Sequence, residues 1–220
     1  MLSQAIEDYL KTIYKLQERN SATTNEIARS LGIAAASVTS MIKRLSEMGL
    51  VHYTAHKGVA LSEAGRKIAL EIIRHHRLLE LYLMEALGYS WDRVHEEAEK
   101  LEHHISEEFE DRIAEFLGHP THDPHGDPIP TKDGELPEFF SQPLVSVPEG
   151  ECVSIRRVSA HDPELLRYLA ELGLKPNTEV TIVSKAPFNG PVTLQISGQE
   201  RIIGREVAGN LFVSVVERAG

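Results

Sequence analysis

A stretch rich in proline and glycine, residues 118–150, divides this chain of 220 residues into two differently patterned parts. Before it, apolar residues recur every three or four positions, which is typical of amphipathic helices. After it, short β-prone runs (153–158, 179–183, 192–196 and 212–216) alternate with turns, and Asp162-Pro163 begins one predicted helix. Because proline fixes φ and lacks a backbone donor, the dividing stretch can be neither regular helix nor central strand. The sequence therefore predicts a mainly helical part followed by a small β-barrel.

A helix-turn-helix is predicted near the N-terminus. Thr23 and Glu26 have the spacing of a capping box, and Gly32 supplies the turn after that helix. Two short β-prone segments around Gly58 predict a hairpin, which in this position would be a wing. The helices are expected over residues 3–18, 24–31 and 35–48, and the strands over 50–53 and 59–61. This order predicts a winged helix-turn-helix, a module that binds DNA.

Charge is distributed unevenly along the chain, whose formal net charge is −10. Residues 1–70 carry nine Lys and Arg against six Asp and Glu, whereas residues 71–140 carry six against eighteen. Eight of the eleven histidines also lie in residues 71–140. A mildly basic segment suits a polyanionic partner, and an acidic, histidine-rich segment suits bound cations.

The run 95–108 gives the strongest indication of a ligand site. One helix is expected over about 91–117, with Ser90 as its cap, and a preceding helix over about 62–86. Residues three or four apart on a helix are neighbours. The side chains expected to share faces in this way are His95, Glu99, Glu102 and His103 on the later helix, and His76 and Glu80 on the earlier one. Such crowded carboxylates and imidazoles favour a divalent cation between them, and the alternative is a solvated acidic face.

The order of these features resembles the diphtheria toxin repressor family of metal-dependent transcriptional regulators, on its three-domain manganese-regulator side. The segments that carry the resemblance are IEDYLKTIYKL (6–16), RHHRLLELYL (74–83) and EEAEKLEHHIS (96–106). The fold class that it implies is mainly α with small β. The implied domains are a winged helix-turn-helix domain (1–70), a helical dimerisation and metal-binding domain (71–140) and an SH3-like β-barrel (146–220) similar to small ferrous-transport accessory domains.

The resemblance also implies which residues bind metal. One site would use Asp8, Glu99, Glu102 and His103. A second site would draw on His76, Glu80, His95, Asp123, His125 and Asp162. Two-domain manganese regulators have a glutamate where this chain has Lys11, so a closely spaced metal pair is not expected. Iron-type members have Met and Cys in place of Asp8 and Glu99, and some members have a glutamate ligand in place of Ser159.

The expected ligands offer oxygen and imidazole nitrogen, without thiolate. Because such donor sets suit Mn(II), that ion is the expected cofactor and Fe(II) is the alternative. Zn(II), Co(II) and Cd(II) are expected to occupy the sites in vitro, since intrinsic affinity does not by itself favour Mn(II). The single cysteine, Cys152, excludes an internal disulfide.

The second short helix of the predicted helix-turn-helix is expected to enter the major groove, because its exposed residues are small or hydroxylated. The residues expected at DNA are Ala36, Ser37, Thr39, Ser40, Lys43, Arg44 and Lys57. For the three basic residues, the alternative is ordinary surface charge. The function expected is that of a metal-activated repressor of manganese or iron homeostasis. It would bind palindromic operator DNA as a homodimer formed through the helices around 62–117.

The chain contains neither an apolar run long enough to span a membrane nor a signal-peptide pattern, so a cytoplasmic location is expected. Two other functions remain open from the residues alone. A metallohydrolase could use the same ligands around a catalytic ion, although no separate nucleophile or base stands out. A winged-helix regulator could instead sense a small organic effector, and its operator binding would then be unchanged by a chelator.

Overall fold

The computed structural model describes residues 2–18, 22–54, 58–138, 140–159 and 162–216. The chain forms two compact units rather than one compact body for each of the three segments expected from the sequence. The first unit comprises Met1–His76, Leu101–Glu107 and Pro130–Leu136, and the second comprises Arg77–Lys100, Glu108–Ile129 and Pro137–Gly220. The limits of the three expected domains stay a prediction.

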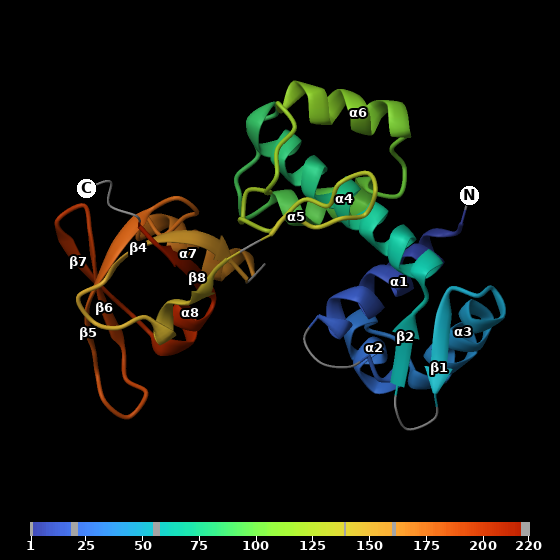
Figure 1. The fold of residues 1–220 in the computed structure, drawn as a ribbon, viewed down its shortest axis with the longest axis horizontal. Coiled ribbons are helices and arrows are strands. Elements are labelled where there is room, and N and C mark those ends of the chain that lie inside the picture. The colour runs from blue at the N-terminus through green and yellow to red at the C-terminus, as the bar shows by residue number, and fades with distance from the viewer. Residues whose placement is uncertain (1, 19–21, 55–57, 139, 160–161, 217–220) are drawn as a thin grey trace. The chain divides into compact units, whose positions relative to one another are not determined.

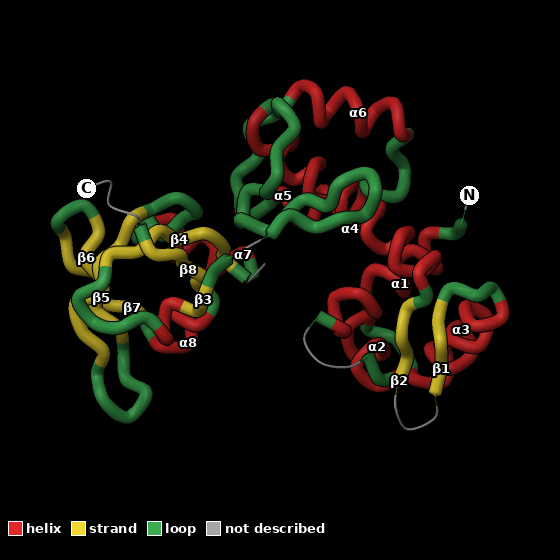
Figure 2. Tube along the Cα trace, in the orientation of Figure 1, coloured by secondary structure: helices red, strands yellow, loops and turns green. Residues whose placement is uncertain are grey.

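The first unit contains a helical module with a two-stranded wing, as Figures 1 and 2 show. Its elements are α1 (Gln4–Gln17), α2 (Thr24–Leu31), α3 (Ala35–Glu47), β1 (Val51–Thr54) and β2 (Gly58–Leu61), and the two strands pair antiparallel. The hydroxyl of Thr23 accepts from the backbone N–H of Glu26, and the carboxylate of Glu26 accepts from that of Thr23. Gly32 ends α2 with a left-handed φ of 66°. The winged helix-turn-helix and its capping box are therefore confirmed.

Apolar side chains from every element of this module form one core. Fully or almost fully buried members are Leu10, Ile13, Ile27, Val38, Ile42, Leu45 and Val59. Burying a side chain of this size stabilises a fold by about 1.5–3 kcal/mol. Because Val38, Ile42 and Leu45 lie on one stripe of α3, that helix presents its opposite, polar face to solvent.

The helix α4 (Glu63–Glu85) agrees with the long helix expected after the wing, and the Ser62 hydroxyl accepts from the backbone N–H of Gly65 at its start. The next expected helix was wrong, because two helices stand in its place: α5 (Val94–Leu101) and α6 (Glu107–Phe116). The Glu102 carbonyl oxygen lies 3.2 Å from Nδ1 of His75, a contact that takes the place of continued helical pairing. The break lets the consecutive residues Glu102 and His103 contribute to one cluster of side chains, whereas consecutive residues of a helix do not face each other.

The second unit contains a six-stranded antiparallel sheet. Its strands are β3 (Gln142–Pro143), β4 (Cys152–Val158), β5 (Glu179–Lys185), β6 (Val192–Ile196), β7 (Gln199–Ile203) and β8 (Leu211–Val215). The strand order is β3-β8-β4-β5-β6-β7, and among the described residues β3 and β7 are edges that do not pair with each other. The expected closed barrel is therefore corrected to an open sheet, because the two-residue β3 is too short to close it.

Three short helices accompany this sheet: η1 (Leu144–Ser146), α7 (Pro163–Glu171) and α8 (Arg205–Gly209). The carboxylate of Asp162 accepts from two backbone N–H groups at the start of α7, which confirms the predicted cap. The sequence analysis missed β3, β7 and α8. No helix in the described part of the chain combines the length and apolar character needed to cross a membrane.

Candidate metal centres and DNA-facing helix

The imidazole of His103 is the centre of a ligand cluster in the first unit. Its Nε2 atom lies 2.8 Å from Oδ1 of Asp8 and 3.3 Å from Oε1 of Glu102. Asp8 comes from α1, and the other two residues come from the segment between α5 and α6. One possible ligand atom from each residue lies within 4.8 Å of the others. Two carboxylates and a ring nitrogen that converge in this way can hold a divalent cation.

The other ring nitrogen of His103 identifies a residue that the sequence analysis missed. Nδ1 lies 2.7 Å from Oε2 of Glu7, and because a carboxylate accepts, Nδ1 donates its proton there. A histidine that binds a metal through one nitrogen usually donates the other N–H to a carboxylate, which fixes the tautomer and the ring orientation. Glu7 is placed to do this. No spacing pattern indicated Glu7, since it precedes Asp8 directly in α1.

Glu102 is fully buried and lies at the meeting point of three other side chains. Nζ of Lys11 donates to both carboxylate oxygens, at 2.8 and 2.7 Å, and also lies 3.4 Å from Nδ1 of His76. The same His76 nitrogen is 2.5 Å from Oε2 of Glu102. A buried carboxylate is costly unless it is paired, and here the pairing reaches α1 through Lys11 and α4 through His76.

The second unit holds another cluster, made by Glu80 of α4 with Asp123 and His125 of the proline-rich segment. All three side chains are buried, and one ligand atom of each lies within 4.8 Å of the others. Nδ1 of His125 is 3.6 Å from Oε2 of Glu80, and Nδ1 of His95 is 2.9 Å from Oε1 of Glu80. The structure therefore brings together four of the residues expected in the second site.

The backbone and the Trp91 ring fix the orientation of the His125 ring. Nε2 lies 2.8 Å from the carbonyl oxygen of Trp91, and since a carbonyl only accepts, Nε2 carries the proton and Nδ1 faces Glu80. The Trp91 ring stacks on the imidazole at 5.7 Å between centroids. Gly126 has a φ of +87°, and a Cβ there would overlap the carbonyl oxygen of Arg156. This turn therefore requires glycine.

Electrostatics also favour a cation in this cluster. Burial raises the pKa of Asp123 well above its usual value, and the nearby charges of Glu80 and Asp127 raise it further. Burial lowers the pKa of His125, but the hydrogen bond to Glu80 and the charges of Glu80 and Asp123 outweigh this and raise it to about 9. Both shifts show a site where carboxylates are crowded and positive charge is favoured. The donor set and its charge fit a divalent cation.

Besides His95, three expected ligands are not members of the two groups described above, Asp8–Glu102–His103 and Glu80–Asp123–His125. Glu99 has a half-exposed side chain, with Oε1 3.8 Å from Nε2 of His95. Asp162 is exposed and caps α7, and it is not among the described residues that group as possible ligands. His76 contacts Glu102 in the first unit, whereas Glu80 and His95 meet in the second. A ligand role for Glu99, Asp162 and His76 stays a prediction.

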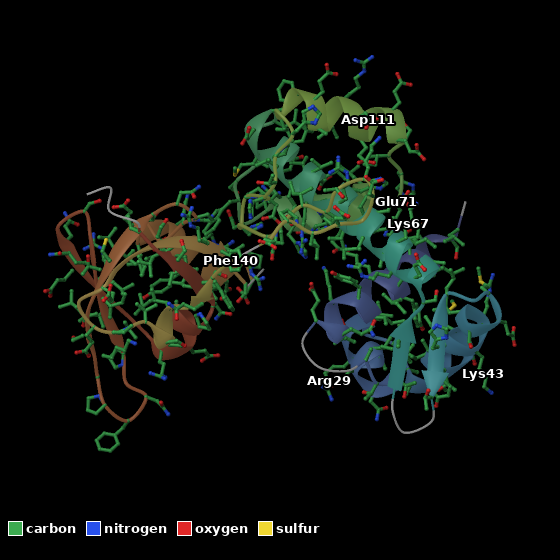
Figure 3. The ribbon with its side chains drawn as sticks, in the orientation of Figure 1. Arg29, Lys43, Lys67, Glu71, Asp111 and Phe140 are labelled. Atoms are coloured by element: carbon green, nitrogen blue, oxygen red, sulfur yellow. The ribbon has the colours of Figure 1, made fainter. Side chains whose placement is uncertain are left out.

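The residues expected to contact DNA lie on the exposed face of α3. Those that the structure describes are Ala36, Ser37, Thr39, Ser40, Lys43 and Arg44, and all are exposed. The hydroxyls of Thr39 and Ser40 donate to carbonyls one turn earlier, at 3.0 and 3.3 Å, so each oxygen still has a lone pair to offer. Figure 3 shows Lys43 on the outer side of α3. Lys57 lies outside the described residues.

Three family models match consecutive parts of the chain. They are described as the N-terminal DNA binding domain of iron dependent repressors (residues 1–59), the metal binding and dimerisation domain of iron dependent repressors (62–131) and the FeoA domain (142–215). The iron-dependent repressor IdeR of Mycobacterium tuberculosis is 33% identical over 214 residues, covering 91% of this chain and 92% of that protein. The diphtheria toxin repressor of Corynebacterium diphtheriae is 29% identical over 211 residues, covering 90% and 92%.

Solved structures extend the similarity to three dimensions. A manganese-dependent transcriptional repressor in complex with manganese matches with a TM-score of 0.89 and 37% identity, over 96% of this chain and 99% of the other. ScaR with bound Cd²⁺ matches with a TM-score of 0.81 and 33% identity, over 96% and 99%. ScaR with bound Zn²⁺ matches with a TM-score of 0.80 and 33% identity, over the same shares.

Proposed function

Because the chain belongs to the family of iron-dependent and diphtheria toxin repressors, it is a metal-dependent DNA-binding repressor, and we propose that Mn(II) activates it. Membership also means that it binds divalent metal and operator DNA, acts as a homodimer and is not an enzyme. This removes the metallohydrolase alternative. A protein that acts on chromosomal DNA fits the expected cytoplasmic location.

The observation that carries the choice of Mn(II) is the chemistry of the two clusters. Asp8, Glu102 and His103 in one cluster, and Glu80, Asp123 and His125 in the other, offer only carboxylate oxygens and imidazole nitrogens. Soft thiolate ligands favour other ions, whereas carboxylate-rich sets suit Mn(II). The one cysteine, Cys152, lies in β4 of the sheet. The manganese-bound structure, at 37% identity, supports the same choice.

The first cluster explains how metal can control the DNA-binding module. Asp8 lies on α1, whose residues Leu10 and Ile13 share a core with α3, while Glu102 and His103 lie on the segment 101–107. Asp8, Glu102 and His103 would hold a divalent ion, which would supply the positive charge that these converging groups need. Asp8 and His103 would then stay together, and α1 would be held at a fixed angle to that segment. The shared core would in turn set the orientation of α3.

The second cluster contributes to the same switch. Moving a two-state balance from 1:99 to 99:1 requires about 5.5 kcal/mol of differential binding. Couplings between two sites are typically about 1–3 kcal/mol. Several ions in the homodimer must therefore act together. Glu80, Asp123 and His125, with His95 beside Glu80, supply the further site in each subunit.

On the DNA, α3 of each subunit is proposed to lie in a major groove, so that the dimer reads a palindrome. Hydroxyls of Thr39 and Ser40 would serve base edges or phosphates, and Lys43, Arg44 and Lys57 would contact phosphates. The regulated genes would be those of manganese or iron uptake, which a repressor shuts when metal is plentiful.

Anaerobic titration of the protein with Mn(II) and Fe(II) tests the choice of metal. Operator DNA is first selected from random duplexes with the metal-loaded protein, and binding is then followed by fluorescence anisotropy at buffered free-ion concentrations. We expect Mn(II) to activate operator binding at the concentrations of free Mn(II) that are found in cells. Activation by Fe(II) alone would transfer the assignment to iron. Selection of the same DNA with chelator present would instead support an organic effector.

A further inference from the structure

One face of α4 contacts the proline-rich segment over several turns. The residues that make these contacts are spaced three or four apart along the helix: Leu70, Arg74, Arg77 and Glu80. Oε2 of Glu80 lies 3.6 Å from Nδ1 of His125, and Arg77 donates to the carbonyl oxygen of Pro128. One turn earlier, Arg74 donates to the carbonyl oxygen of Pro130 at 2.8 Å. A Cβ at Gly134 would lie 3.6 Å from Cδ1 of Leu70. The segment 123–136 therefore runs along α4 in the opposite direction.

The two ends of the segment 123–136 belong to different units. The part that ends at Ile129 lies in the second unit and carries Asp123 and His125 of the second cluster, whereas residues 130–136 lie in the first unit. There Leu136 packs against the apolar core that α1 and α3 share. The chain therefore leads within a few residues from two candidate metal ligands to the core of the DNA-binding module.

The backbone of this segment is restrained between its two ends. Pro128 and Pro130 have a fixed φ, and the side chain of Ile129 between them is only 2% exposed. Beyond them, the backbone N–H of Thr131 donates to the carbonyl oxygen of Glu135 at 2.8 Å. A segment with these restraints has few conformations with which to absorb a change at one end, so an ordered first end favours an ordered second end.

We propose that the segment 123–136 is a strap through which the second metal cluster acts on the DNA-binding module, and that Arg74 is the positioning residue that secures the strap to α4. This inference rests on the second metal site and on the metal-dependent repression proposed above. Asp123 and His125 hold the first end of the strap when they bind metal. The hydrogen bond from Arg74 keeps the second end on α4, and Leu136 then supports the core shared by α1 and α3.

Hydrogen–deuterium exchange of the full chain, with chelator and then with saturating Mn(II), tests the strap directly. In the wild type, Mn(II) is expected to slow exchange at the backbone amides of Thr131 and Gly134, which donate to carbonyl oxygens within residues 131–135. His125→Ala should abolish this slowing, because the first end of the strap is then no longer held by metal. His119→Ala, which changes an exposed histidine outside the cluster, should preserve it.

The variant Arg74→Met tests the role of the arginine, because it keeps the apolar stem and removes the donor to Pro130. At saturating Mn(II) it should bind as many ions per chain as the wild type, and its metal-free operator binding should be unchanged. Its Mn(II)-dependent gain in operator affinity should be smaller by at least about fivefold, the lower end of typical couplings between two sites. Arg66→Met, at an exposed position of the same helix, should keep the wild-type gain.

Two results would overturn the strap. One is wild-type exchange at residues 131–136 that Mn(II) does not slow, or slows equally in His125→Ala, and this result needs no folded Arg74 variant. The other is an Arg74→Met variant with the full Mn(II)-dependent gain, or one that loses metal-free operator binding by the same factor, as a purely structural residue would. Failure of the underlying second site would appear differently, as an Mn(II) count per chain that His125→Ala leaves unaltered, and it would remove the strap as well.

Discussion

At the scale of single residues, the ring of His103 is held on both sides by carboxylates from α1. Nδ1 donates to Glu7 at 2.7 Å, while Nε2 faces Asp8 at 2.8 Å. The first contact fixes which nitrogen carries the proton, and the second leaves the other nitrogen facing the candidate metal position. Glu7 is thus a positioning residue that does not itself need to touch the metal.

The variant Glu7→Gln is expected to weaken Mn(II) binding at this site by about 10–100-fold, because loss of such a supporting carboxylate typically has this effect. Competition against a fluorescent chelator measures the change. Glu18→Gln, at the exposed end of the same helix, is the matched control and should bind Mn(II) as the wild type does. Equal affinities for the wild type and Glu7→Gln would show that Glu7 has no orienting role.

Metal binding at the second cluster should depend on pH. Without metal, the pKa of His125 is about 9 against an ordinary 6.5, so the ring carries an extra proton at neutral pH. Nδ1 would have to lose that proton before it could be a metal ligand. Apparent Mn(II) affinity at this cluster should therefore rise by about tenfold per pH unit as pH increases from 6 to 8. At lower pH the imidazole stays protonated, and the apparent Mn(II) affinity of this cluster is lost.

Calorimetry in two buffers of different ionisation enthalpy would count the protons released. At least about one proton per ion should leave the second cluster at pH 7. The exposed His119 provides a control, since His119→Ala should leave the proton count unchanged while His125→Ala lowers it. Mn(II) binding that releases no protons would show that His125 is not a ligand.

The family resemblance implied one site made of Asp8, Glu99, Glu102 and His103, and in the structure Asp8, Glu102 and His103 form one group. Contacts outside the expected site could not be predicted. Glu7 was missed because its only signal is a single adjacent carboxylate. The sequence has Lys11 where two-domain manganese regulators have a glutamate. Only the fold shows that the ammonium group of Lys11 is hydrogen-bonded to Glu102, because 91 residues separate the two.

At the scale of elements, periodicity predicted the helices of the first module with bounds within a residue or two. It wrongly predicted a helix at residues 102–106, where apolar residues still recur at helical spacing (Leu101, Ile105 and Phe109) but the backbone leaves the helix. The competing interaction is tertiary, because the Glu102 carbonyl meets His75 and its side chain meets Lys11. Such contacts override local pattern and cannot be read from spacing. The short β7 was missed because its residues, QERII, lack a clear alternation.

The exposed face of α3 supports a prediction for DNA binding. Lys43→Ala should weaken binding to operator and unrelated duplexes by a similar factor, because a phosphate contact carries no sequence information. The slope of log affinity against log salt should fall by roughly two for the dimer, one for each lost contact. Anisotropy across a salt series measures this.

The control for this prediction is Lys67→Ala, an exposed lysine on α4 rather than α3. It should leave both the affinity and the salt slope close to those of the wild type. If Lys43→Ala reduced operator binding while sparing unrelated DNA, Lys43 would be reading bases rather than phosphates. An unchanged salt slope would remove Lys43 from the interface.

At the scale of the whole molecule, the order of the modules could be predicted from the sequence, because charge and hydrophobic periodicity change along the chain. A mildly basic helical segment precedes an acidic, histidine-rich one, and β-prone runs follow the proline-rich stretch. Whether the sheet closes into a barrel could not be predicted from the sequence, because it depends on pairing between β3 and β7, which lie far apart in the chain. The division into two compact units was also hidden, since segments 101–107 and 130–136 join the first unit only in three dimensions.

The central claim is that a divalent ion held by the first cluster switches DNA binding on. The most direct test is operator anisotropy with chelator and then with saturating Mn(II), for the wild type and for Asp8→Asn, an isosteric change of a side chain that is 34% exposed in the wild type. The account predicts that Mn(II) strengthens wild-type binding by at least about 100-fold and that Asp8→Asn loses most of this gain while its metal-free binding is unchanged. An equal Mn(II)-dependent gain in both proteins, or none in the wild type, would contradict it.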